Sequence, residues 1–197
     1  SSLKGKMRSL LETSGYTVGG KPKPKPRRED QGTLSCGCAQ CVPCWLFGCG
    51  DARKREAQPT RLLIRDAFIT EEDRKVLAQY LEEGILYSEI KTEVTMDRST
   101  GRVAQMGPRT MDRIMRGTSL LFECSARVYE GDNVNEMKEA FIHGAQLLVN
   151  DCIGGSGSRG YGKIGFAELK FGEENIAEEI HSPEELKRIR ALKLGQL

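Results

Sequence analysis

Five cysteines crowd the stretch CGCAQCVPCWLFGC, residues 36–49. Thiolates are the ligands that structural Zn²⁺ sites prefer, and C-x-x-C is the spacing of a metal-binding knuckle. No His, Asp or Glu lies inside the stretch to leave an open catalytic position. The pattern therefore predicts a structural zinc that clamps the loop. Because tetrahedral coordination uses four thiolates, the predicted ligands are Cys36, Cys38, Cys41 and Cys44, with Cys49 as the alternate.

Two other interpretations of these cysteines stay open. A thioredoxin-type C-x-x-C would use the same spacing, but it would lie between a strand and a helix without further cysteines beside it. Unliganded thiols are the second alternative, and the density of the cluster argues against them. The remaining cysteines, Cys124 and Cys152, lie apart from the cluster and are expected to be core thiols.

A second candidate site is the glycine-rich stretch GGSGSRGYGKIGF, residues 154–166. It contains G-x-G-x-x-G, but the predicted order of helix, loop and strand is the reverse of a dinucleotide-binding unit. It also contains G-x-x-x-x-G-K, yet Ile164 stands where a P-loop needs Ser or Thr for Mg²⁺. Small residues around Arg159 would still let a phosphodiester approach the backbone closely. We therefore expect the ligand to be a nucleic-acid backbone.

Side chains and backbone of this loop could bind phosphates and ribose 2′-hydroxyls without reading base identity. The alternative is a mobile turn in which the tyrosine only packs on the sheet. The RNA-binding candidates here are Ser156, Ser158, Arg159, Gly160 and Tyr161.

The opening residues SSLKGKMRSLLE supply a third candidate site. Three basic residues alternate on the first turns of a predicted helix, where free N–H groups already favour phosphate. An ordinary solvated helix face is the alternative. The RNA-binding candidates of this segment are Ser2, Lys4, Lys6 and Arg8.

Hydrophobic periodicity indicates which elements carry these sites. It predicts helices over residues 1–13, 70–84 and 133–152, and strands over residues 61–69, 118–130 and 163–171. A proline- and lysine-rich segment after the first helix is expected to be a flexible basic linker. The order helix, strand, strand, helix, strand indicates an α+β fold that resembles a ferredoxin-like unit without its opening strand. Since no initiator Met or strand precedes the first helix, we expect further native sequence before Ser1.

Residues 88–117 alternate polar and apolar side chains around a turn at 99–101, which predicts an extended hairpin or arm. An apolar Met106, flanked by Arg98, Arg102 and Arg109, could wedge between stacked nucleotides while the guanidinium groups hold the backbone. The alternative is that the methionines of this segment fill gaps in a core.

Composition adds few constraints on function. Lys and Arg total 30 against 28 acidic residues, and the net charge of +2 identifies no partner by itself. Basic residues gather in short clusters such as 4–8 and 21–28, whereas the C-terminal region is acidic, as expected if one face meets a polyanion. No apolar run is long enough for a membrane span and no signal peptide is evident. We expect a cytoplasmic protein whose cysteines stay reduced.

Taken in order, these segments resemble the RAMP superfamily, the RNA-binding subunits of CRISPR effector complexes. The likeness is greatest to the backbone subunit of the type III-A (Csm) complex. It rests on the opening SSLKGKMRSLLE, on LFG at 46–48, on RLLIRDAF at 61–68, on the arm sequence TEVTMDRSTGRVAQMGPRTMDR and on GGSGSRGYGKIGF. The opening motif and the glycine-rich motif in this order are far more specific than either alone.

The resemblance implies a ferredoxin-like, RNA-recognition-like core formed by residues 1–13 and 60–172. Within it, residues 14–59 would form a zinc-bearing insertion, 88–117 a protruding thumb, and 173–197 a C-terminal helical tail. The implied partners are guide (CRISPR) RNA and target RNA, further copies of the chain in a helical filament, and other subunits of a prokaryotic type III complex.

The resemblance also implies that target RNA is cut at regular intervals with a divalent metal such as Mg²⁺. In the family the catalytic aspartate lies in a loop before the SSLKGK helix, so no residue of this chain is expected to be catalytic. Two alternatives remain: a non-cleaving guide-RNA scaffold, and a stand-alone zinc-containing RNA-binding protein.

Overall fold

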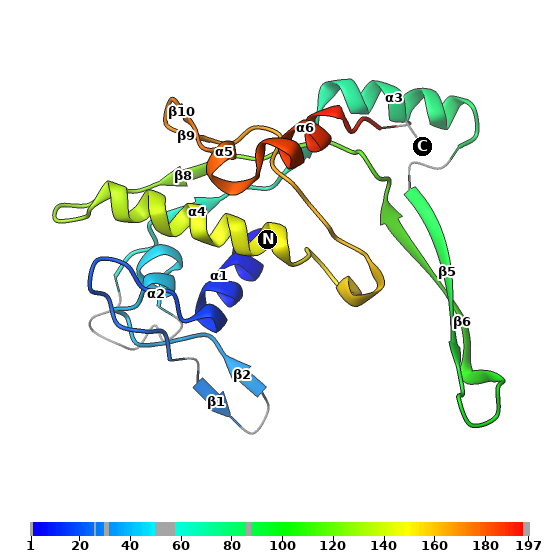
Figure 1. The fold of residues 1–197 in the computed structure, drawn as a ribbon, viewed down its shortest axis with the longest axis horizontal. Helices are drawn as coiled ribbons and strands as arrows, with labels where there is room; N and C mark the ends of the chain where they lie inside the picture. Colours follow the sequence, from blue (N-terminus) through cyan, green and yellow to red (C-terminus); the bar gives the residue numbers. More distant parts are fainter. Residues whose placement is uncertain (1, 26, 30–31, 50–57, 86–87, 195–197) are drawn as a thin grey trace. The chain divides into compact units, whose positions relative to one another are not determined.

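A computed structural model describes residues 2–25, 27–29, 32–49, 58–85 and 88–194. The chain divides into two compact units. The first unit comprises residues 1–66 and 122–191, and the second comprises residues 67–121 and 192–197. Figure 1 shows the helices and strands of both units.

Two helices form the centre of the first unit. Helix α1 (Ser2–Ser14) packs on helix α4 (Val134–Asn150), and the helices predicted for both segments are confirmed. Contact is close because α4 carries Gly144, where a Cβ atom would lie only 2.9 Å from Cγ of Met7. Leu11 is fully buried at the same interface. A glycine at this point lets the two helix backbones approach closely, and the tight packing fixes the position of α1 on α4.

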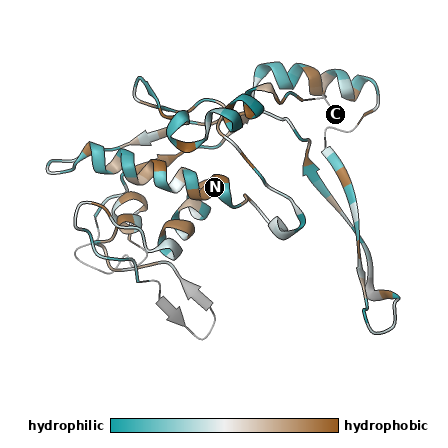
Figure 2. Cartoon of the chain, viewed as in Figure 1, coloured by the Kyte–Doolittle hydropathy of each residue, from teal (hydrophilic) through white to brown (hydrophobic). Residues whose placement is uncertain are grey.

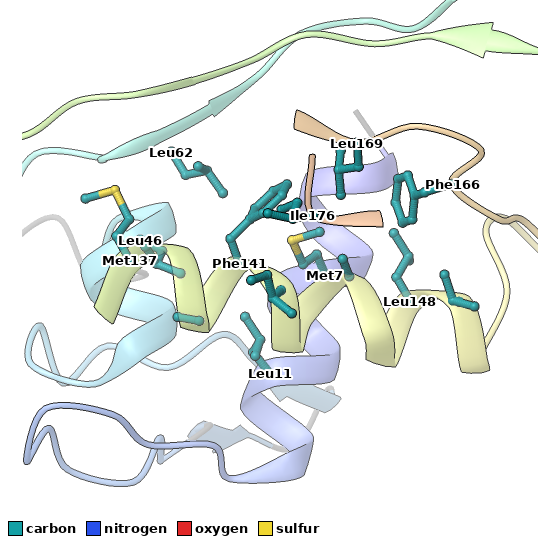
Figure 3. Close-up of a cluster of buried hydrophobic side chains, with 14 of the residues drawn as sticks. Met7, Leu11, Leu46, Leu62, Met137, Phe141, Leu148, Phe166, Leu169 and Ile176 are labelled. Carbon is teal, nitrogen blue, oxygen red and sulfur yellow. The ribbon is translucent and has the colours of Figure 1, made fainter. Parts of the chain in front are cut away.

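The core of the first unit gathers apolar side chains from elements far apart in the sequence (Figure 3). All residues of the short helix α2 (Val42–Phe47) are buried, including Leu46. On α4 the buried residues recur at helical spacing, as predicted for this segment. Deeply buried members of the core are Met7, Leu11, Leu46, Leu62, Met137, Phe141, Leu148 and Ile176.

Short antiparallel strand pairs complete the first unit. Strand β3 (Leu62–Ile64) pairs with β8 (Cys124–Ala126), β1 (Arg27–Glu29) with β2 (Gly32–Leu34), and β9 (Lys170–Phe171) with β10 (Glu174–Asn175). Among the described residues, every sheet has two strands. The mixed α and β composition is confirmed at this level, whereas a ferredoxin-like sheet stays a prediction.

The strand predicted over 163–171 is wrong for most of its length, because only Lys170 and Phe171 are in a strand. The backbone here has other partners, since Phe166 N–H donates to His181 Nε2 at 3.0 Å. Gly165 faces Ile189 of helix α6 at a distance that leaves no room for a Cβ atom. Helices α5 (Ala177–Ile180) and α6 (Pro183–Ala191) thus pack against a segment that sequence alternation had assigned to a sheet.

The second unit consists of helix α3 (Glu71–Glu82), a two-residue strand pair and a long hairpin. Thr70 caps α3 by accepting a hydrogen bond from Asp73 N–H, as predicted. Strand β4 (Phe68–Ile69) pairs with β7 (Leu120–Leu121), so the strand predicted over 61–69 is two short strands, β3 and β4, one in each unit. The strand predicted over 118–130 is interrupted in the same way, between β7 and β8.

The predicted hairpin is confirmed. Strand β5 (Ser88–Met96) runs antiparallel to β6 (Val103–Ile114), and the turn lies where the sequence placed it. Asp97 N–H donates to Arg102 O, and Gly101 adopts φ 66°, a left-handed conformation that glycine adopts without strain. Figure 2 shows hydrophilic and hydrophobic residues along both strands. Within the described residues, no helix is long and apolar enough to cross a membrane.

Candidate RNA interface and metal centre

In the first unit, the first helix contacts the end of helix α4 just before the glycine-rich loop. Lys6 Nζ lies 2.9 Å from the Oδ2 atom of Asp151, the residue that caps the C-terminal end of α4 just before the loop. This hydrogen bond raises the pKa of Lys6 and lowers the pKa of Asp151. The opening motif is therefore placed next to the residue that leads into the glycine-rich motif, although the two motifs are about 150 residues apart in the chain.

The shape of the loop depends on its glycines. Ile153 N–H donates to Gly162 O, and at Gly162 (φ 70°) a Cβ atom would lie 1.9 Å from Ile153 O. At Gly157 a Cβ atom would lie 2.1 Å from Cys152 Sγ. At Gly155, in contrast, no atom lies within 4 Å of a Cβ position. The loop thus packs tightly at its base and leaves its outer part open.

The predicted RNA-binding residues of the loop divide by burial. Ser158, Arg159 and Gly160 are exposed around the single 3₁₀ turn of residues 157–159, and Ser156 is half-buried in a left-handed conformation (φ 59°). Tyr161 is only 9% exposed, which fits the alternative in which it packs on the protein. The loop follows helix α4 as expected, so it does not have the strand-loop-helix order of a dinucleotide site.

The predicted residues of α1 also face different surroundings. Ser2 is the first residue of the helix, and Lys4 is half-buried. Arg8 is directed at the protein: its side chain is 16% exposed, its Nε donates to Glu12 Oε1 at 2.9 Å, and its Nη2 donates to Cys36 O at 3.1 Å. Sequence spacing grouped Arg8 with the two lysines, but the fold places it against the cysteine segment.

Four cysteines of the predicted five converge. The sulfur atoms of Cys36, Cys38, Cys41 and Cys44 all lie within 4.8 Å of one another, and no other such metal-ligand group occurs among the residues that the structure describes. The Cys41 and Cys36 sulfurs are 3.7 Å apart. Tetrahedral bonds of about 2.3 Å to zinc would separate sulfur ligands by about 3.8 Å. Cys49, the alternate, is not in this group.

The surroundings of the sulfurs fit thiolate ligands. Backbone N–H groups of Lys25 and Cys41 donate to the sulfurs of Cys36 and Cys38 at 3.1 and 3.2 Å. Ala39 adopts φ 67°, which costs a non-glycine residue about 1–2 kcal/mol and bends the chain between Cys38 and Cys41. The ligand group consists of four sulfur donors and contains no carboxylate, which matches a structural metal site.

Hydrogen bonds within the cluster shift the pKa values of the Cys41 and Cys44 thiols in opposite directions. The contact with Cys41 lowers the pKa of Cys44 to about 5, while the contact with Cys44, together with burial, raises the pKa of Cys41. Cys44 therefore loses its proton more readily than Cys41 does. A cation among them would replace such protons, because metal ligands are bound as thiolates.

The hairpin presents its own candidate surface in the second unit. Several large apolar side chains on it are exposed: Ile90, Val94, Met96, Val103 and Ile114. Arg98 is exposed at the turn, and Arg109 lies opposite Glu93 in the strand register. For Met106 the structure describes the backbone, as part of β6, and not the side chain. Because Met96 is 51% exposed, the core-filling alternative is wrong for that methionine.

Two carboxylates, one at the hairpin turn and one at the end of α4, have structural partners. Asp97 accepts hydrogen bonds from Ser99 and Thr100, which lower its pKa to about 2 and close the hairpin turn. Asp151 pairs with Lys6.

Sequence reasoning missed one polar cluster. Asp132 accepts hydrogen bonds from Arg61 Nε, from Trp45 Nε1 at 3.1 Å and from Tyr129 N–H at 3.0 Å. Burial opposes the charge of Asp132, but these donors hold its pKa below the ordinary value. The cluster borders a cavity of about 750 Å³ that Lys21 and Glu136 also line. The members of the cluster lie on three separate segments, around residues 45, 61 and 129–132, so no spacing in the sequence could signal it.

Comparison with known proteins relates these features to one family. Residues 1–165 match the RAMP superfamily. The chain is 35% identical over 201 residues to a protein of Methanocaldococcus jannaschii named CRISPR system Cms endoribonuclease Csm3, a match that covers 97% of this chain and 74% of the relative. Proteins of the same name from Methanothermobacter thermautotrophicus and Streptococcus thermophilus are 35% and 36% identical, over 89% and 86% of this chain and 69% and 68% of their own lengths.

Proposed function

The chain belongs to the RAMP superfamily, and from this premise we propose that it binds guide RNA as the backbone subunit of a CRISPR type III effector complex. The observation that carries the proposal is the Lys6–Asp151 contact, which brings the SSLKGK helix to the residue that leads into the glycine-rich loop. In a prokaryotic cytoplasm the partners would be guide RNA, target RNA, further copies of this chain in a helical filament, and other subunits of the complex.

The guide-binding surface combines the first turns of α1 with the outer part of the loop. Lys4 and Lys6 supply positive charge beside a helix N-terminus, and Arg159 is exposed in the loop. Lysine and arginine contacts to phosphate carry no sequence information, which suits a subunit that accepts any guide. Ser156 and Ser158 offer hydroxyl groups to ribose or phosphate.

The hairpin is the proposed thumb. The hairpin has exposed apolar side chains, and arginines lie at and near its turn. This combination suits insertion between bases, because contacts of the cations with the nucleic-acid backbone offset the free-energy cost of unstacking. Met106 remains the predicted wedge, flanked by Arg98 and Arg109. The core that carries this thumb is proposed to be ferredoxin-like, with the cysteine segment as an insertion.

Zinc is the proposed occupant of the cysteine cluster. The four sulfurs, their separations and the backbone N–H donors support a closed structural site held by Cys36, Cys38, Cys41 and Cys44. Such a metal stabilises the local fold and leaves no open coordination position for chemistry.

The relatives are named endoribonucleases of a CRISPR system. A divalent cation such as Mg²⁺ would need oxygen ligands, whereas the metal-ligand group among the described residues consists of thiols. We therefore propose that this chain takes part in a complex that cleaves RNA, and we assign none of its residues to the cleavage step.

Guide affinity over a salt series tests the proposal. For single strands each phosphate contact contributes roughly 0.7 to the slope of log affinity against log salt. The variants Lys4→Ala, Lys6→Ala and Arg159→Ala should each lower that slope and weaken two unrelated guides equally. Lys75→Ala, which removes an exposed charge from α3, is the control and should leave the slope unchanged.

Two results would count against backbone recognition. The first is a wild-type slope in all three variants. The second is a loss of affinity confined to one of the two guides, which would indicate base readout.

A further inference from the structure

Helix α1 is tied to the cysteine cluster by a closed set of three hydrogen bonds. Glu12 Oε1 accepts from Cys36 N–H at 3.0 Å and from Arg8 Nε at 2.9 Å, while Arg8 Nη2 donates to Cys36 O at 3.1 Å. Both main-chain polar groups of Cys36 are thus held by side chains of α1. The sulfur of the same residue belongs to the metal-ligand group.

These contacts lie mostly out of water. Cys36 is fully buried, and the side chains of Glu12 and Arg8 are 8% and 16% exposed. Ionic hydrogen bonds are stronger in such surroundings, and neither charge has water available to replace a lost partner. A movement of Cys36 therefore moves α1, or else leaves buried charges unpaired.

The opposite end of α1 carries the proposed guide contacts. Arg8 lies one turn beyond Lys4, and Lys6 reaches Asp151 at the base of the glycine-rich loop. Between the two ends, Met7 and Leu11 fit against Gly144 of α4 with no spare room. Because α1 is a single rigid element, the hydrogen bonds that hold it at the cysteine cluster also determine where its lysines lie relative to the loop.

We propose that Arg8 and Glu12 are positioning residues that couple metal occupancy of the cysteine cluster to guide-RNA binding at the start of α1. The proposal rests on the proposed function and gives Arg8 a different role from its two lysine neighbours. Metal fixes the Cys36 sulfur, Glu12 and Arg8 fix the Cys36 main chain to α1, and α1 presents Lys4 and Lys6 to RNA. Neither Arg8 nor Glu12 touches phosphate.

Coupling of this kind is reciprocal. If Zn²⁺ raises guide affinity by some factor, bound guide must raise Zn²⁺ affinity by the same factor, and such factors are typically about 5 to 150. A purely structural role for Glu12 would change stability without changing this factor. The coupling factor is therefore the quantity to measure.

The experiment uses the full chain with Zn²⁺ and one guide RNA. Guide affinity is measured with and without Zn²⁺, and Zn²⁺ affinity by competition with a chelator, with and without saturating guide. The variants are Glu12→Ala, Glu12→Gln and Arg8→Gln. Glu71→Gln is the matched control, since it removes the same charge from an exposed ion pair on α3.

In the wild type we expect both coupling factors to be equal and at least about fivefold. Glu12→Ala should bring both toward one. Glu12→Gln keeps an acceptor for Cys36 N–H and loses only the ionic attraction to Arg8, so it should reduce them less. Arg8→Gln should weaken guide binding with an unchanged salt slope, and Glu71→Gln should match the wild type.

Contrary results are distinct. Wild-type coupling in both Glu12 variants would overturn the proposal, and if Glu12→Ala does not fold, an unchanged factor in Glu12→Gln suffices. A salt slope lowered by roughly 0.7 in Arg8→Gln would make Arg8 a phosphate contact instead. Guide binding without any dependence on Zn²⁺ would overturn the coupling alone, whereas no guide binding at all would overturn the proposed function as well.

Discussion

The Arg61–Asp132 pair offers a direct test of how the first unit is held together. Both side chains are 6% exposed, and Nε of Arg61 lies 2.9 Å from Oδ2 of Asp132. Asp132 also accepts from the indole N–H of Trp45 and from the backbone of Tyr129. Asp132→Ala would remove one charge and leave a buried guanidinium whose remaining acceptor, within the part of the chain that the structure describes, is the carbonyl of Pro59.

Removing one partner of a buried ion pair costs about 3–5 kcal/mol, because the other charge stays out of water without compensation. For a chain of this length each kcal/mol lowers the melting temperature by about 2–4 °C. We therefore expect Asp132→Ala to lower the melting temperature by about 6–20 °C. Glu71→Ala, which breaks an ion pair with both side chains more than half exposed, should cost at most about 1 kcal/mol.

The pH dependence has a definite sign. The folded-state pKa of Asp132 lies below its unfolded value of about 3.9, so the pair stabilises the protein fully above that pH. Its contribution is lost as the pH falls through the lower, folded-state pKa. In Asp132→Asn the loss of stability between about pH 4 and the acid limit should therefore be shallower than in the wild type.

Thermal melting followed by circular dichroism, at pH 7 and over an acid series, measures both effects. The reasoning would be refuted if Asp132→Ala melted within the range of Glu71→Ala at pH 7. An acid profile of Asp132→Asn parallel to that of the wild type would refute the pH argument.

Two further predictions concern the metal site and the loop. The double variant Cys41→Ser, Cys44→Ser should lose bound zinc in elemental analysis, and its solubility or assembly should fall before its cleavage activity does. A wild-type preparation free of zinc and iron would contradict the structural assignment, and so would a folded, RNA-bound variant that lacks only cleavage. Gly157→Ala should lower stability by about 1–3 kcal/mol because its Cβ atom would lie 2.1 Å from Cys152 Sγ, while Gly155→Ala, with no atom within 4 Å, should be neutral in the same melting assay; equal melting temperatures would show that the loop can move aside.

Features set by neighbouring residues could be predicted from the sequence. The apolar spacing of α1 and α4, the Thr70 cap of α3 and the turn of the β5–β6 hairpin all express local periodicity or local hydrogen bonding. The cysteine cluster belongs to the same class, because its four ligands lie within nine residues and a short loop suffices to bring them together. The resemblance to the RAMP superfamily likewise rested on local motifs.

Features set by distant partners could not be predicted. Alternation over residues 163–171 indicated a strand. In the fold, however, this segment contacts His181 and helix α6 where a strand would contact its neighbours in a sheet. Asp132 acquires two of its three donors, Trp45 and Arg61, from segments more than 70 residues away, and Arg8 acquires Cys36 from 28 residues away. Local pattern thus determined which segments form helices, turns and the cysteine cluster. Only tertiary packing decided which polar groups become buried together. Because a buried polar group has no water to bond with, its hydrogen bonds must come from the groups that the fold places beside it.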